Sequence, residues 1–517
     1  MSNSYLAIEL SAGILLLLAY QKLYKLYKDH RPPGPSGLPI IGNIHQIRTR
    51  PWLAFTEWSH KYGPLFRINV AGQTTIILNS HKAATDLLDR RSALYSDRPR
   101  NIVTRILTGD MVFAFSQIGP IWRRMRKAAH DATGPQIVKT YHPLMEREAL
   151  ALTSQMLNFP TQFNDHIKRA SASLLMAIVY GTPIMHSDDP LVEAIQQHVA
   201  RNLASAAPGA FLVEYFTWME KLPRWMCKWR RDAEYWFEKD SAMLNGLFVD
   251  SKARQESGDD VPCVVATLIE NMDEEGLSEA DAAWLGATLF SAGAETSSGQ
   301  MEWFMISMIL HPEAQKAAQH QIDDVVGRGR MPTLEDYEHL PYVRALVKEL
   351  LRWRPVLPLG VPHRLSQDDW YEGHYIPKDS IVIPNVWALN HDPVVYGEDA
   401  EEFRPERHLN DAGNLNTPTK DTHDESHFSY GFGKRICVGR HVANRSLFIE
   451  IATILWSFDI RAPLDESGKT ILPDSKPKRD GSLVLRPDHF RCEITPRFPD
   501  VSVVIRMYLD DEQLSKS

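Results

Sequence analysis

The chain reads Tyr430-Gly431-Phe432-Gly433-Lys434-Arg435-Ile436-Cys437-Val438-Gly439 just ahead of a segment with helical periodicity. This stretch places one cysteine in a glycine-rich loop, beside Lys434 and Arg435. Neighbouring cations and a helix N-terminus both favour the thiolate form of a cysteine. Glycine, which lacks a side chain, lets backbone N–H groups come close to the sulfur. We therefore expect Cys437 to be held as a thiolate.

Two interpretations of Cys437 are open at this point. An isolated intracellular cysteine is usually a small buried hydrophobe with no chemical role. A thiolate in this setting can also ligate a metal, and a single protein thiolate is sufficient as the axial ligand of a haem iron. The choice depends on whether other segments of the chain supply the remaining parts of such a site.

The stretch resembles the haem-binding signature of the cytochrome P-450 superfamily, which is written FxxGxRxCxG. Gly433, Arg435, Cys437 and Gly439 match this signature in register. Tyr430 takes the place of the signature's phenylalanine; its hydroxyl needs a hydrogen-bond partner if it is buried. The resemblance implies a haem b whose iron is ligated by Cys437, with Tyr430 and Gly433 in the loop beneath it and Arg435 on a propionate.

The run from Leu285 to Leu310 is long, apolar and helical in pattern, with residues 292–297 (Ala-Gly-Ala-Glu-Thr-Ser) at its centre. One interpretation is a helix packing point, where glycine permits close approach and the hydroxyls bond to the preceding turn. The segment also resembles the oxygen-activation motif of P-450 enzymes. That resemblance implies that Gly293 leaves a groove over the haem, that Thr296 hydrogen-bonds the dioxygen being activated, and that Glu295 helps to relay protons.

Glu349 and Arg352 form an ExxR pattern, which places the two side chains on one helix face. Such a pair arises by chance in many chains, and an exposed pair contributes only about 0–1 kcal/mol. Here it precedes residues 403–407 (Phe-Arg-Pro-Glu-Arg), which resemble the family's PERF-type segment, although His408 takes the place of the final Phe. The resemblance implies a buried triad of Glu349, Arg352 and Arg407 that braces the loop carrying Cys437.

Trp122 and Arg126 form a WxxxR pattern, one helical turn apart. Both can donate hydrogen bonds to a haem propionate, as the family resemblance implies. Arg123 and Arg124 belong either to an ordinary basic surface or to a docking site for an acidic redox partner. By resemblance His363 is another propionate ligand; a structural histidine with satisfied hydrogen bonds is the alternative.

The order of predicted elements indicates a mainly α protein with small β-sheets, which is the α+β arrangement of the P-450 fold. Residues 64–80 read as a β-hairpin with Gly72 between the strands. Helical periodicity dominates from 81 to 350. Short strand-like runs return at 380–383, 482–485 and 501–507.

Composition sets further limits. The chain has 517 residues, of which 44% are hydrophobic and 24% charged, enough for one large core. Its net charge of −8 argues against nucleic acid as a partner, because that would require a basic face. The four cysteines show neither a disulfide framework nor a zinc pattern; they are Cys227, Cys263, Cys437 and Cys492.

The N-terminus differs from the rest. Residues 5–20 are nearly all apolar, short for a spanning helix of roughly 20 residues, and lysines follow at 22, 25 and 28. A cleaved secretory signal is the alternative, but it would have a basic segment first. We expect a transmembrane anchor at 1–28, a proline-rich hinge at 29–43 and a haem-thiolate monooxygenase domain at 44–517. By the positive-inside rule the basic flank keeps the following chain in the cytoplasm, and the family resemblance implies a single-pass protein of the endoplasmic reticulum membrane.

The substrate pocket is defined only by resemblance. Most positions that it would use are apolar, which implies a lipophilic small molecule; they are residues 98–118, 204–216, Ala292, 357–361 and 481–484. The segment from Phe211 to Trp229 is dense in aromatic residues with interleaved cations. Core packing and a membrane-dipping access region both explain such a pattern.

The motifs occur in family order over about residues 30–500, and several weak motifs in one order are jointly specific. The chain therefore resembles a membrane-anchored P-450 monooxygenase, particularly fungal members that oxidise terpenoids or other secondary metabolites. The chain shows no flavin or nicotinamide fingerprint, so NADPH-derived electrons are expected from a separate reductase, with cytochrome b5 as a further partner. Two alternatives stay open: a reductase-independent haem-thiolate peroxygenase or isomerase, and a non-catalytic membrane haem-binding protein.

Overall fold

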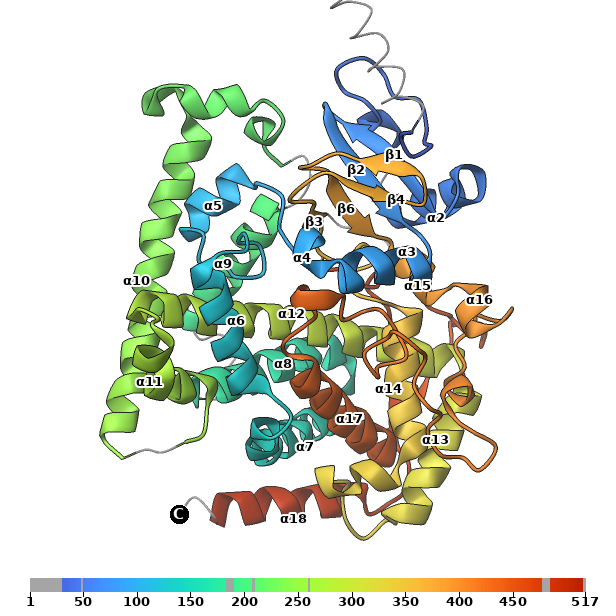
Figure 1. Ribbon diagram of the computed structural model, residues 1–517. Helices are drawn as coiled ribbons and strands as arrows, with labels where there is room; N and C mark the ends of the chain where they lie inside the picture. Colours follow the sequence, from blue (N-terminus) through green and yellow to red (C-terminus); the bar gives the residue numbers. More distant parts are fainter. Residues whose placement is uncertain are drawn as a thin grey trace, which may run out of the picture.

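The computed structural model describes residues 30–47, 50–182, 190–206, 210–258, 261–476 and 484–514. Helices make up most of it, and the main sheet with strand β4 (Asp369–Tyr371) lies at one side (Figure 1). The prediction of a mainly α protein with small sheets is thus confirmed. The longer helices are α2 (Pro51–Tyr62), α6 (Pro120–Thr133), α7 (His142–Asn158), α8 (Phe163–Tyr180), α9 (Pro190–Ala206), α10 (Lys228–Glu256), α11 (Val264–Glu275), α12 (Glu279–Leu310), α13 (Pro312–Val325), α14 (Pro341–Trp353), α17 (Arg440–Ser457) and α18 (Val501–Leu514).

Shorter helices connect these elements. They are α3 (His81–Ala84), α4 (Ser92–Tyr95), α5 (Ile102–Thr108), α15 (Val386–Asn390) and α16 (Pro393–Tyr396), with a π-helical turn, η2, at Thr85–Arg90 and a 3-10 turn, η10, at Gly433–Arg435.

The main sheet has the strand order β1-β2-β6-β3. Strands β1 (Leu65–Val70) and β2 (Gln73–Leu78) form the predicted antiparallel hairpin. Strand β6 (Ile381–Pro384) pairs parallel with β2, and β3 (His363–Arg364) pairs antiparallel with β6. Two further pairs stand apart: β4 (Asp369–Tyr371) with β5 (His374–Ile376), and β7 (Phe458–Arg461) with β8 (Glu493–Pro496).

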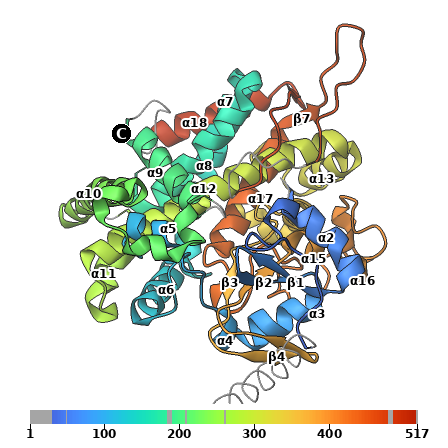
Figure 2. The ribbon, with the colours of Figure 1, turned by 90° about the horizontal axis from the view of Figure 1, so that it is seen from above.

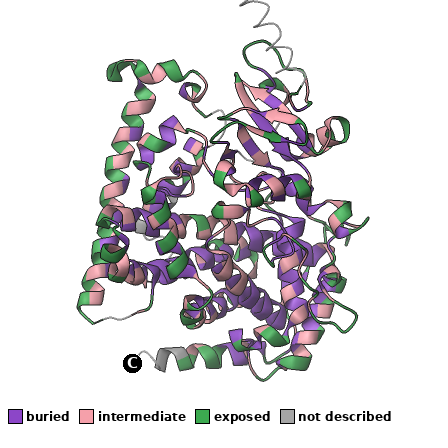
Figure 3. Cartoon of the chain, in the orientation of Figure 1, coloured by how far each residue is buried: buried purple, intermediate pink, exposed green. Residues whose placement is uncertain are grey.

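Helix α12 crosses the centre of the molecule in both ribbon views (Figures 1 and 2). It begins with a capping box in which Ser278 and Asp281 satisfy each other's backbone N–H groups. Both of its ends are largely buried against neighbouring helices, whereas the stretch Ser291–Ser297 stays partly exposed (Figure 3). The apolar run therefore lies along a core helix that, beyond its first turn, is most accessible around its middle.

Gly293 serves helix packing. A Cβ atom at this position would lie 2.7 Å from the Cδ1 atom of Leu175 on α8. The packing interpretation thus describes this glycine, because α8 packs against this face of α12 along much of its length. The expectation that it leaves a groove over a haem stays a prediction.

Two strand predictions near the C-terminus need correction. Residues 501–507 begin helix α18, because Val501, Val504 and Ile505 are buried at the i, i+3, i+4 spacing of a helix. Of the run 482–485, only Val484 and Leu485 are described, and they form no strand.

The N-terminal predictions fall largely outside the described residues, because the expected anchor at 1–28 lies beyond them. Searching the described ranges finds no helix with the length and apolar character needed to span a membrane. The described part of the proline-rich hinge packs against the hairpin: Arg67 donates from its backbone N–H to Pro33 and from Nε to Pro32, at 2.8 and 3.1 Å.

Candidate active site

The loop around Cys437 folds back on itself before α17. The backbone N–H of Cys437 donates to the carbonyl of Tyr430 at 2.8 Å. Gly433 has a φ of +53°, and a Cβ atom there would lie 2.2 Å from the carbonyl oxygen of Leu88. Glycine is therefore required at this turn, both for its conformation and for the close contact with η2.

Cys437 is a free, partly buried cysteine whose thiol lies in the interior. Burial raises its pKa, while the backbone N–H of Gly439 and the charges of Arg126 and Arg440 oppose that rise. The expectation that Lys434 stabilises the sulfur is wrong, because its side chain is directed to solvent. The cations that act on the sulfur come from α6 and from the first residue of α17.

Arg435 is likewise turned away from the sulfur. Its guanidinium donates to the carbonyls of Ser96, Phe113 and Ser116 at 2.7–2.9 Å and lies over the ring of Trp122. Burial, together with the charge of Arg126, lowers the pKa of Arg435 to about 9. Arg435 thus joins the loop to the segment before α6.

Arg98 lies close to Arg435 and was not predicted from the sequence. Its side chain is buried and donates to the carbonyls of Ala114, Val361 and Pro362. Burial and the charge of Arg435 lower its pKa strongly. Nothing in the local sequence marks Arg98, because the segments that it joins are about 260 residues apart.

The guanidinium groups of Arg98, Arg435 and Arg126 form a chain in which each acts on the next, and Arg126 also acts on Cys437; none of the three has a direct carboxylate partner among the described residues. Arg126 makes no hydrogen bond to a described residue, and burial lowers its pKa. Buried cations without counter-charges are costly. An anionic group that accepts charge-assisted hydrogen bonds is the chemistry that this cluster fits.

Trp122 and His363 form part of the same wall. The indole N–H of Trp122 donates to the carbonyl of Phe113 at 3.1 Å. The Nδ1 atom of His363 lies 2.7 Å from the carbonyl oxygen of Tyr95, and burial with the charge of Arg98 keeps its pKa well below the usual value. His363 has the satisfied contact of a structural histidine, and its role as a propionate ligand stays a prediction.

Tyr430 has the hydrogen-bond partner that its buried position requires. Its hydroxyl donates to Asn444 Oδ1 at 2.7 Å, and Asn444 Nδ2 donates to the carboxylate of Glu425 at 2.9 Å. The ring also contacts His427, with ring centroids 5.1 Å apart. The departure from phenylalanine in the signature is thus matched by a polar partner on α17.

The predicted residues of α12 lie within its partly exposed stretch. The hydroxyl of Thr296 donates to the Ala292 carbonyl at 2.7 Å, and the methyl of Ala292 is exposed. The carboxylate of Glu295 accepts from Arg486 at 2.9 Å. Arg486 was not predicted, because it comes from a C-terminal segment with no motif.

The residues of the ExxR and PERF-like motifs meet in the core. Arg352 donates to both carboxylate oxygens of Glu349, at 2.7 and 2.8 Å, and neither side chain is exposed. Arg407 donates to Glu349 at 3.0 Å, and His408 Nε2 lies 3.0 Å from its other oxygen. Burial alone would raise the pKa of Glu349, but its bonds with Arg352 and His408 hold that pKa far below its usual range.

This cluster is joined to the cysteine loop through Asn390. Arg352 donates to the Asn390 carbonyl at 2.7 Å. The side chain of Asn390 accepts from the backbone N–H of Phe428 and donates to the hydroxyl of Ser429. Ser429 is followed directly by Tyr430, so the buried ion cluster holds the start of the loop.

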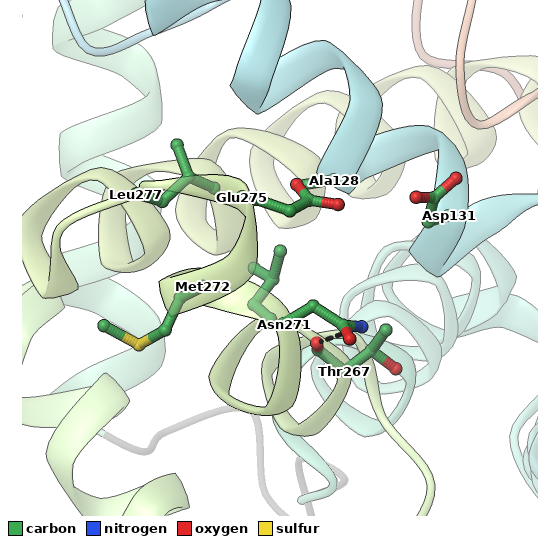
Figure 4. Close-up of a pocket in the computed structure, with 8 residues that line it drawn as sticks. Ala128, Asp131, Thr267, Asn271, Met272, Glu275 and Leu277 are labelled. Carbon is green, nitrogen blue, oxygen red and sulfur yellow. Dashed lines mark hydrogen bonds between the residues drawn. The ribbon is translucent and has the colours of Figure 1, made fainter.

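Together these residues fit a haem held by one thiolate. A single free thiol suits haem iron as a ligand. The cluster of Arg98, Arg126 and Arg435 suits the two carboxylates of the haem edge. A shallow depression between α6 and α11, lined by Asp131, Asn271 and Glu275 among others (Figure 4), contains none of the residues of the candidate haem site and is no part of it.

Comparison with known proteins agrees with this geometry. The family model described as Cytochrome P450 matches residues 32–492. A cytochrome P450 monooxygenase of Armillaria gallica is 49% identical over 494 residues, covering 95% of each chain. Cytochrome P450 monooxygenase 58 of Postia placenta is 46% identical, covering 96% of this chain and 94% of its own. One of Amanita muscaria is 36% identical, covering 98% of each chain. This chain therefore belongs to the cytochrome P450 monooxygenase family.

Proposed function

We propose that this protein hydroxylates or otherwise oxidises a lipophilic small molecule, such as a terpenoid or another secondary metabolite, with dioxygen and NADPH-derived electrons from a separate reductase. The observation that carries the proposal is the free thiol of Cys437 in the interior, beside a partly buried arginine, Arg126, whose charge acts on that sulfur and which has no hydrogen-bond partner among the described residues. A bound haem would supply dioxygen activation at its iron.

The residues of the chain would hold the haem in place and supply protons on its substrate side. Cys437 ligates the iron; the backbone N–H of Gly439 and the charges of Arg126 and Arg440 stabilise its thiolate. Arg98, Arg126 and Arg435 neutralise the haem carboxylates. Thr296, whose hydroxyl here donates to the Ala292 carbonyl, would redirect that hydrogen bond to the substrate side, and Glu295 would supply protons there. The exposed methyl of Ala292 gives that side an apolar surface, which supports a lipophilic substrate.

A reductase and cytochrome b5 are proposed as electron donors. Exposed cations on α6 and on the cysteine loop support this proposal: Arg123 and Lys434 both point to solvent. They lie close in sequence to Arg126 and Cys437, so an acidic partner bound there would approach the thiolate side of the haem.

We propose that the protein is attached to the endoplasmic reticulum membrane by residues 1–28, with the catalytic domain in the cytoplasm. Exposed apolar residues support a membrane-facing surface. They lie in two segments at the upper end of the view in Figure 1: Leu38, Ile40 and Ile41, and Leu212, Trp218, Trp225 and Met226. Bulky apolar side chains on the surface near basic ones are typical of interfacial contact.

The test compares two ways of driving the haem-loaded, full-length protein. The protein is co-expressed with a reductase, and untargeted profiling compares the host's metabolites. We expect oxidised products when NADPH and the reductase supply the electrons. Thr296→Ala should release more hydrogen peroxide per NADPH, whereas the neighbouring Ser297→Ala should not. Turnover with peroxide but none with the reductase would replace the proposal with a peroxygenase; no oxidised product under either condition would contradict it.

A further inference from the structure

One arginine joins two acidic residues of α12. The Arg486 guanidinium donates to the carboxylate of Glu295 at 2.9 Å and to that of Glu302 at 2.8 Å. It also donates to the hydroxyl of Ser298 at 2.7 Å and to the backbone carbonyl of Glu295 at 3.2 Å. Four acceptors from one face of the helix thus share a single cation.

The position of Arg486 is fixed by its neighbour. Leu485 donates from its backbone N–H to the Val356 carbonyl at 2.7 Å, and its own carbonyl accepts from the indole of Trp303 at 3.1 Å. The side chain of Leu485 is buried. Arg486 therefore approaches α12 from a backbone that is held on both sides.

The geometry of α12 separates the acid from the hydroxyl that it is proposed to serve. Glu295, Ser298 and Glu302 are spaced i, i+3, i+7 and share one face of the helix. Thr296 follows Glu295 directly, so its side chain points about 100° away around the axis. While Glu295 is bound to Arg486, its carboxylate lies on the Glu302 face and not beside Thr296.

The two carboxylates differ in their surroundings. The side chain of Glu295 is 35% exposed and that of Glu302 is 7% exposed. Burial raises the pKa of Glu302, and the charges of Arg486 and of Lys168 on α8 oppose this. Glu295 can therefore exchange protons with water, whereas Glu302 is a fixed counter-charge for the guanidinium.

We propose that Arg486 is a positioning residue for Glu295: it holds this carboxylate back on the Glu302 face, and Glu302 keeps the guanidinium neutralised whenever Glu295 turns toward Thr296. This inference rests on the proposed role of Glu295 in proton supply. Arg486 then sets how often the acid is available, and Glu302 competes with Glu295 for the same cation. Removing Arg486 and removing Glu302 must act in opposite directions.

The test uses haem-loaded, full-length protein with reductase and NADPH and without an added organic substrate. It measures the fraction of consumed oxygen released as hydrogen peroxide, and the rate ratio between H₂O and D₂O. Arg486→Gln should reduce the D₂O effect because Glu295 is free to turn. Glu302→Gln should increase it, with rate changes of about fivefold for the loss of one partly buried ion pair. Arg486→Lys keeps the charge, so its D₂O effect should be closer to that of the wild type.

Two controls separate positioning from folding. Arg491→Gln changes an exposed arginine of the same segment and should alter nothing. Amide hydrogen exchange of the resting protein should become faster at residues 484–486 and 295–299 in Arg486→Gln but not in Arg491→Gln. This second readout does not depend on turnover.

Three results would overturn the inference. The first is that Arg486→Gln and Glu302→Gln change the D₂O effect in the same direction or leave it unchanged. The second is that Arg486→Gln still changes the D₂O effect by the full amount in a protein that already carries Glu295→Gln. The third is that Glu295→Gln alone leaves the peroxide fraction unchanged, in which case the proposed role of Glu295 itself fails.

Discussion

His408 Nε2 lies 3.0 Å from the Oε2 atom of Glu349, in a site where the Glu349 side chain has no exposed surface. The carboxylate also accepts bonds from Arg352, from Arg407 and from the backbone N–H of Arg404. His408 stands where the family pattern has phenylalanine, so it adds a fourth partner to a cluster that would otherwise have three.

We expect His408→Phe to reduce the free energy of unfolding by about 1 kcal/mol, because Glu349 keeps its other partners. Glu349→Ala should cost about 3–5 kcal/mol, because it leaves Arg352 as a buried charge without its counter-charge. Chemical unfolding and the haem content per protein would check both. Haem content should be near normal in His408→Phe and low in Glu349→Ala; equal effects of the two changes would contradict this account.

Arg126→Leu should weaken haem retention without destabilising the haem-free protein. Arg126 is largely buried and forms no hydrogen bond with a described residue, so its removal should not destabilise the haem-free protein. Its loss should speed haem release, because one cation of the cluster that faces the haem carboxylates is gone. Haem transfer to an acceptor protein measures the release rate. An unchanged rate would remove Arg126 from the haem site.

Tyr430→Phe should remove one hydrogen bond and leave the pair of Asn444 and Glu425 intact. The expected loss of unfolding free energy is about 1 kcal/mol, since the lost partner, Asn444, keeps its second contact. Because Cys437 donates to the backbone of Tyr430, we also expect a shift in the haem reduction potential, measured by spectroelectrochemistry. An unchanged potential with the same loss of stability would show that the hydroxyl serves packing alone.

A buried carboxyl on α17 predicts a pH dependence of stability. Burial, with the nearby charge of Glu148, raises the pKa of Glu450 to about 8. The pKa of Glu450 is thus higher in the folded protein than in the unfolded chain. Its contribution to the free energy of unfolding is therefore fully present below about pH 4.5 and is lost as the pH rises through 8. Glu450→Gln should reduce the fall in the free energy of unfolding between pH 5 and pH 8 by roughly 1–4 kcal/mol. A curve that keeps its slope would rule out Glu450 as the source.

Sequence patterns identified the parts of the fold that depend on local periodicity. The hairpin at β1 and β2, the long helix α12 and the turn before Cys437 all follow from spacing and glycine placement. Sequence patterns also predicted that Glu349, Arg352 and Arg407 meet, because their motifs occur in a fixed order.

Other parts of the site could not be read in this way. Arg98 and Arg486 act through contacts with segments far away in the chain, and neither has a distinctive neighbour in sequence. Arg435 and Lys434 were expected beside the sulfur because they are adjacent to it in sequence, but side-chain direction decides such contacts. The start of α18 was mistaken for a strand because a short run rich in valine suits both structures.

The central claim is that Cys437 ligates a haem iron as a thiolate. The most direct measurement is the absorption spectrum of the reduced protein with carbon monoxide, compared among wild type, Cys437→Ser and the matched control Cys492→Ser, which replaces a cysteine in the segment before β8. The account predicts the red-shifted band of a thiolate-ligated haem in the wild type and in Cys492→Ser, and its loss in Cys437→Ser. The same band in Cys437→Ser, or its absence from haem-loaded wild type, would contradict the account.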